Sequence, residues 1–124
     1  MQATFSPILV AIEQVRAGKL CALAGTGASP SQALPGIPTV AEFVPGYEAI
    51  ALKGVGAPKD TPREIIAKLN DADNAGLADS ELQSRLAELG SVPAPMTPSE
   101  FANLIFDETE KWGRVLKSAG IKAV

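Results

Sequence analysis

Apolar residues return every three or four positions in four stretches of this chain, which is the spacing of one face of an α-helix. The stretches predict helices over residues 7–17, 62–78, 81–89 and 98–119. The last is the most regular, and its apolar stripe consists of Phe101, Leu104, Ile105, Trp112, Val115, Leu116 and Ala119. We therefore expect this stripe to form the packing face of the longest helix.

Local signals mark where these helices start and stop. Four Ser or Thr residues are followed three positions later by Glu or Gln, which is the pattern of a capping box. The pairs are Thr39 with Glu42, Thr61 with Glu64, Ser80 with Gln83, and Thr97 with Glu100, and Ser6 before Pro7 offers a simpler cap. Gly18, Gly90 and Gly120 follow three of the predicted helices, where a helix commonly ends.

Short apolar runs between the helices predict a few strands. They cover Gln2–Phe5, residues 20–25 and residues 47–55, while residues 92–96 make a poor edge strand because their prolines cannot donate to a ladder. Strands that alternate with helices indicate an α/β fold. The strands are too few for a complete doubly wound sheet, so the pattern predicts a helix-rich part of a larger fold.

Composition excludes several classes of function. The chain has 124 residues and a formal net charge of −3, and its scattered basic residues argue against nucleic acid as a partner. It has no histidine and one cysteine, so imidazole catalysis and the usual metal-ligand clusters are excluded and no cofactor is expected. Cys21 lies in an apolar run and is expected to be a small core residue rather than a reactive thiol.

Two places in the chain could hold an anion through main-chain N–H groups. Thr26 lies in the run GTG after a predicted strand, which lacks the further residues of a phosphate loop and is more simply a tight turn. Phe5 and Ser6 precede a helix N-terminus, where the helix dipole favours an anion, although a simple Ser cap is the alternative. Glu108 falls on the apolar stripe without an evident partner and is expected to be a rim residue rather than a site carboxylate. No carboxylates are paired for acid–base chemistry, so we do not expect an enzyme.

Several runs along nearly the whole chain resemble the periplasmic substrate-binding receptors of tripartite tricarboxylate transporters, the Bug family. AGKL followed by ALA resembles the family's AGKLRALAVT, and ALPGIPTVAEFVPGYE resembles ALPDVPTVAEAGLPGYE with one residue fewer. TPREIIAKLN, LADSELQSRLAELG, TPSEFANLI and KWGRVLKSAGIKA then follow the family in order. The resemblance implies a partial type II periplasmic-binding-protein fold, helix-rich with a few short strands.

The resemblance also implies a division of the chain. Residues 1–46 would end the second receptor domain, residues 47–58 would be the interdomain crossing strand and hinge, and residues 59–124 would return to the first domain. The three prolines and two glycines within residues 33–48 would then form a stiff approach to the hinge.

By the same resemblance, the function would be the non-catalytic binding of a small carboxylate, such as a dicarboxylate, a tricarboxylate or an acidic amino acid. Phe5 and Thr26 match positions of the family, and Ser6 stands where an acidic residue is usual, so these three are the expected ligand-binding residues. The main carboxylate-holding loops of the family come from segments that this chain lacks, so binding is expected to be reduced or absent in the chain alone.

Partners and location follow from the resemblance and from the unmatched strand edges. The family implies a membrane transporter complex as partner and a periplasmic location, whereas a chain without a signal peptide would stay in the cytoplasm if it were the whole gene product. The alternative function is a self-associating interaction module that binds no ligand. Exposed strand edges recruit other chains, so we expect a homodimer or a larger homo-oligomer.

Overall fold

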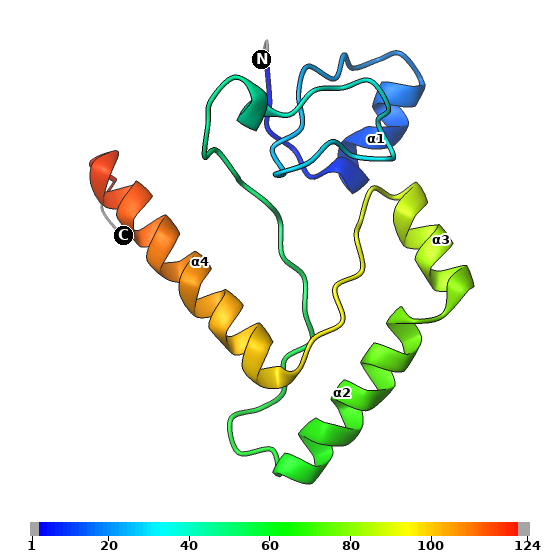
Figure 1. Cartoon of the computed structure of the whole chain (residues 1–124), viewed down its shortest axis with the longest axis vertical. Coiled ribbons are helices and arrows are strands. Elements are labelled where there is room, and N and C mark those ends of the chain that lie inside the picture. The colour runs from blue at the N-terminus through cyan, green and yellow to red at the C-terminus, as the bar shows by residue number, and fades with distance from the viewer. Residues whose placement is uncertain (1–2, 122–124) are drawn as a thin grey trace.

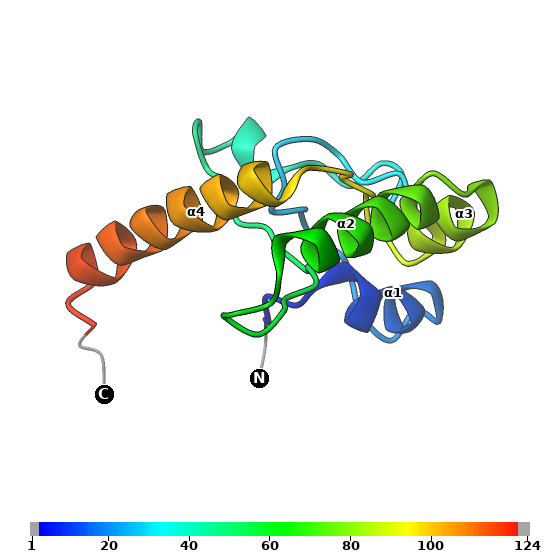
Figure 2. The same ribbon diagram turned by 90° about the horizontal axis from the view of Figure 1, so that it is seen from below.

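The computed structural model describes residues 3–121, and Figure 1 shows how its elements are arranged. In chain order they are α1 (Ile8–Arg16), the 3-10 turn η1 (Val40–Glu42), α2 (Arg63–Leu77), α3 (Ser80–Glu88) and α4 (Pro98–Ser118). Two extended segments, residues 47–58 and 91–97, run between α4 on one side and α2 and α3 on the other (Figure 1). Figure 2 shows that α4 projects away from the rest of the chain.

Each of the four predicted helices is confirmed to within one residue at either end. The glycine stops are confirmed as well, because Gly18, Gly90 and Gly120 have positive φ angles of 68°, 71° and 69°. α2 and α3 follow each other closely and pack together. The local spacing of apolar residues and the helix-ending glycines were therefore sufficient to place the helices.

Two of the predicted capping boxes form. The Thr97 N–H donates to the Glu100 carboxylate at 2.7 Å, and the Glu100 N–H donates to the Thr97 hydroxyl at 3.2 Å. The Thr97 N–H, together with the Thr97 hydroxyl that donates to the same carboxylate at 2.8 Å, holds the pKa of Glu100 below its ordinary value. In η1, the Thr39 N–H likewise donates to the Glu42 carboxylate at 2.7 Å. Both boxes satisfy N–H groups that have no partner within the helix.

The other predicted caps are wrong. The Thr61 hydroxyl donates to the Pro58 carbonyl at 2.8 Å and so closes a turn before α2 instead of capping it. Asp79 caps α3 by accepting the Leu82 N–H at 2.9 Å, which leaves Ser80 as the first helical residue. Ser6 precedes the N-cap of α1, and its hydroxyl donates to the adjacent Pro7 carbonyl at 3.5 Å instead of accepting a helix N–H. Several neighbouring residues can take the N-cap position of each helix, and the sequence pattern does not show which of them does.

The predicted strands do not form within residues 3–121. Their place is taken by extended chain with a single parallel bridge, in which the Gly25 N–H donates to Pro38 and the Val40 N–H donates to Gly25, each at 2.8 Å. Residues 3–5, 20–24, 47–55 and 92–96 have no ladder, because no extended neighbour pairs with them. Gln2 lies outside the described residues.

The chain is also far more exposed than a self-contained globule of its size. A compact monomer of 12.8 kDa has an accessible surface of about 6,300 Å², whereas this chain has 9879 Å². Ile12, on α1, is the one apolar side chain among the described residues that is fully buried. The expectation that Cys21 lies in a core is wrong, because its run forms no covered strand and the thiol is exposed.

A few long-range contacts hold the parts together. The Arg16 guanidinium donates to the Glu88 carbonyl at 3.1 Å, which joins α1 to the end of α3. Beside this bond, the Ile8 side chain lies against the backbone of Gly90. The segment that precedes residue 47 therefore folds back onto the helical part of the chain.

The extended segment before α4 is held by α2. The side-chain amides of Asn70 and Asn74 both donate to the Met96 carbonyl, at 2.9 and 3.3 Å. The first turn of α4 in turn lies on the other extended segment, where the Phe101 ring covers the backbone of Gly54. These contacts fix where α4 begins, and the rest of the helix continues beyond them (Figure 2).

Candidate functional site

The turn at Thr26 is fixed from both sides by main-chain hydrogen bonds. Gly25 is paired with residues 38 and 40 on one side, and the Thr26 carbonyl accepts the Ala49 N–H at 2.9 Å on the other. The N–H groups of Thr26 and Gly27 donate no hydrogen bond to another described residue. This half-buried turn thus presents main-chain donors in a position set by its neighbours, which is an arrangement suited to an anion.

Phe5 and Ser6 lie outside this turn. The Phe5 ring is 84% exposed, and Ser6 is exposed with its hydroxyl directed to the adjacent carbonyl. Among the described residues, no hydrogen bond joins Phe5 or Ser6 to Thr26. Thr26 therefore lies in a turn that main-chain hydrogen bonds hold in place, whereas Phe5 and Ser6 lie in an exposed segment before α1.

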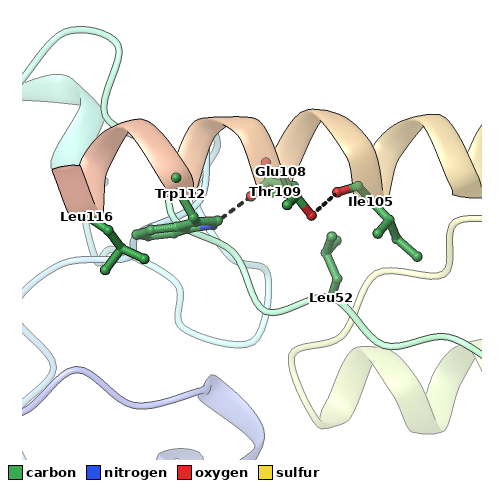
Figure 3. Close-up of a pocket in the computed structure, with 7 residues that line it drawn as sticks. Leu52, Ile105, Glu108, Thr109, Trp112 and Leu116 are labelled. Carbon is green, nitrogen blue, oxygen red and sulfur yellow. Dashed lines mark hydrogen bonds between the residues drawn. The ribbon is translucent and has the colours of Figure 1, made fainter. Parts of the chain in front are cut away.

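A groove along α4 is a second candidate site, which was not predicted from the sequence. It is an open groove of about 470 Å³, lined by Leu52, Ile105, Glu108, Thr109, Trp112, Gly113 and Leu116. In Figure 3 the Leu52 side chain stands opposite the helix, and the Trp112 and Leu116 side chains point to the same side. The groove is mainly apolar, with one charged residue in its wall.

That charged residue, Glu108, has partners that the sequence pattern did not reveal. Its carboxylate accepts a hydrogen bond from the Lys111 ammonium at 2.8 Å and another from the Trp112 indole N–H at 2.9 Å. Figure 3 shows the bond to Trp112. The Lys111 nitrogen also lies 5.6 Å from the centre of the Trp112 ring. The Lys111 ammonium thus pairs with Glu108, three residues earlier on α4, and forms no ion pair with Asp107 among the described residues.

The hydrogen bond from Lys111, assisted by the indole N–H, lowers the pKa of the Glu108 carboxyl, while partial desolvation opposes the change. We expect this carboxylate to stabilise the fold above its unfolded-state pKa of about 4.5 and to lose that contribution as the pH falls through its lower folded-state pKa. Glu108→Gln should therefore flatten the acid side of the melting-temperature profile, measured by circular dichroism.

Glu110→Gln is the matched control, because Glu110 is an exposed residue on the same helix that forms no ion pair with a described residue. If both variants keep the parent chain's slope of melting temperature against pH below about pH 4.5, the bonds of Glu108 to Lys111 and Trp112 do not contribute to acid stability.

Other kinds of site find no support in the part of the chain that the structure describes. Residues 3–121 contain no group of three His, Cys, Asp or Glu side chains that could bind a metal ion. None of the helices in this range has the length and apolar character needed to cross a bilayer.

Comparisons with known proteins agree along nearly the whole sequence. The model of the tripartite tricarboxylate transporter family receptor matches residues 2–121. BugT of Bordetella pertussis is 34% identical over 112 residues, which make up 90% of this chain and 34% of that protein. This chain spans about a third of the length of several curated relatives that it matches.

Solved structures show the same relation. An R. palustris protein with adipate superposes with a TM-score of 0.87 and 34% identity, over 94% of this chain and 40% of that one. The periplasmic binding protein BugD superposes with a TM-score of 0.74 and 30% identity, over 90% and 38%. The chain thus has a helix-rich part of the α/β periplasmic-binding-protein fold, and it belongs to the tripartite tricarboxylate transporter receptor family.

Proposed function

We propose that this chain supplies one wall of a binding site for a small carboxylate in a periplasmic receptor that serves a membrane transporter. The single observation that carries the proposal is the turn at Thr26, whose position is fixed by main-chain bonds on both sides and whose N–H groups are free of other described residues. Such groups suit a carboxylate oxygen. The adipate of the R. palustris neighbour makes a dicarboxylate the first solute to test.

The proposed role is binding without chemistry. Main-chain donors orient an anion but transfer no proton to or from it, and the Glu108 carboxylate is already engaged by Lys111 and Trp112. In this proposal Phe5 and Ser6 reach the solute from the chain before α1, and Thr26 provides the fixed donors. The ligand is then held between this wall and surfaces contributed from outside the described residues.

The domain division predicted from the resemblance is part of the proposal. Residues 47–58 are tied at their start to Thr26 through Ala49 and near their end to α4 through Gly54 and Phe101. They therefore connect the proposed binding wall with the helical part, which is what a crossing strand between residues 1–46 and 59–124 would do. The contact between Ile8 and Gly90 limits how far the two parts of this chain can separate.

Titration with adipate, followed by amide chemical shifts in NMR spectra, tests the binding role. We expect the Thr26 and Gly27 amides to shift with a dissociation constant of about 1 mM or weaker, because one wall offers few contacts. The uncharged diamide of adipate is the matched control and should cause no such shift. If these two amides stay unmoved while adipate shifts others or none, the proposed site is wrong.

A further inference from the structure

We propose that α3 moves as one rigid body with residues 1–46, and not with the rest of residues 59–124, when the receptor opens and closes. The chain would then cross between two bodies at three places, which are residues 50–51, residues 78–79 and residues 91–95. The proposal refines the proposed domain division, on which it rests. Its test needs no solute, so it can fail while the proposed binding site stands.

The first support is a polar contact between α1 and the end of α3. The Arg16 guanidinium donates to the Glu88 carbonyl at 3.1 Å, and its other nitrogen donates to the Glu13 carboxylate at 2.8 Å. Glu88 is the last residue of α3, where carbonyl groups lack partners within the helix and the helix dipole favours a cation. Arg16 is thus held from both sides and satisfies the end of a helix that lies far away in the sequence.

The second support is apolar packing at the same place. The Ile8 side chain lies against the backbone of Gly90, and a Cβ atom at Gly90 would also meet the Ala33 side chain at 3.5 Å. The absence of a side chain therefore lets the end of α3 approach two separate segments of residues 1–46. Together with the bond from Arg16, this α1–α3 contact joins the two parts at several points, as a rigid body requires.

α2 and α4 have other partners. The side-chain amides of Asn70 and Asn74 hold α2 to the Met96 carbonyl, directly before α4. The groove on α4 is in turn lined by Leu52 of the extended segment. Among the described residues, no hydrogen bond or ion pair joins α2 or α4 to residues 3–46. These two helices therefore form the second body with the later part of the extended segment.

α3 also contacts α2, but the hydrogen bond between them lies at the corner where one helix follows the other. The Gln83 side-chain amide donates to the Leu77 carbonyl at 2.8 Å. Such a bond keeps the two helix ends together while the angle between the helices is set by what each of them contacts elsewhere. The corner at residues 78–79 can thus be a boundary between the bodies.

The other two crossings are limited by the contacts on either side of them. Ala49 is bonded to the turn of the binding wall and Leu52 lines the groove on α4, so the first crossing lies at residues 50–51. Residues 91–95 lie between the α1–α3 contact and the start of α4. Each crossing is a short extended segment or a helix corner, which can change a few φ and ψ angles without unfolding a helix.

Residual dipolar couplings of the backbone amides, measured on the weakly aligned wild-type chain, test which helices move together. We expect the couplings of α1 and α3 to fit one order tensor in the orientation of the structure. α2 and α4 should share a second tensor with a different degree of order. If α3 follows α2 and α4, the proposal is wrong. A single tensor for all four helices would overturn it as well, because no boundary would then exist.

A substitution in the α1–α3 contact tests its cause. Arg16→Ala should remove the common tensor, with the degree of order of α3 falling away from that of α1. Arg85→Ala is the matched control, because Arg85 lies on α3 and pairs at 2.7 Å with Glu81 of the same helix. This variant should keep the common tensor. Equal results for the two variants would contradict the role of Arg16, and the wild-type couplings decide the proposal if Arg16→Ala does not fold.

Discussion

Replacing Gly90 by alanine is expected to lower the free energy of unfolding by about 2–4 kcal/mol. Two costs add at this position. Its φ angle of 71° is unfavourable for any residue with a Cβ atom. In addition, the new methyl group would clash with the Ile8 side chain, which lies over the glycine. Urea unfolding followed by circular dichroism measures the loss.

Gly120→Ala separates the two costs. Gly120 has a φ angle of 69° at the end of α4, and an added Cβ would meet nothing within 4 Å, so this variant carries the backbone strain alone. It should cost about 1–2 kcal/mol. The double variant Ile8→Ala/Gly90→Ala should recover part of the Gly90→Ala loss through relief of the clash. If Gly90→Ala costs no more than Gly120→Ala, α1 does not pack on the end of α3 as described.

Replacing Gly54 by alanine is expected to cost about 1–3 kcal/mol and to loosen the first turn of α4. The new Cβ would clash with the Phe101 ring, so either the ring or the extended segment must move. Far-ultraviolet circular dichroism and urea unfolding report the stability, and the exchange of α4 amides reports the loosening.

Gly56→Ala is the matched control for this contact. Gly56 lies two residues further along the same extended segment, and an added Cβ there would meet nothing within 4 Å. We expect its free energy of unfolding to stay within about 0.5 kcal/mol of the parent value. Equal effects of the two substitutions would show that packing against Phe101 is not the cause of the loss.

The sequence predicted the parts of this fold that depend on near neighbours. The box between Thr97 and Glu100 spans three residues and forms as expected. α4 likewise follows from its own apolar spacing. The strand at residues 20–25 needed a partner along its whole length, but the described residues pair only with Gly25, so the part of the run that contains Cys21 stays exposed. Strand pairing depends on segments that are far apart in the sequence, and the pattern within one segment does not show whether a partner exists.

In the candidate site, too, features set by near neighbours were predicted and features set by distant residues were not. Thr26 could be singled out because a turn after a short apolar run is a local feature, but its fixation by Ala49 joins residues far apart in the sequence. The groove on α4 brings Leu52 to Trp112 across an even longer separation, and no signal in either run points to the other. Glu108 found its partners on its own helix, where several neighbours compete for each charge.

The exposed run from residue 51 to residue 60 also determines how the chain meets a protease. Proteases bind substrates as extended backbone with free amide and carbonyl groups, and this run already has that form without local unfolding. It contains Lys53, which a trypsin-like enzyme recognises. One cut there would divide the turn at Thr26 from α4, so the survival of the intact chain among proteases depends on whatever covers these ten residues.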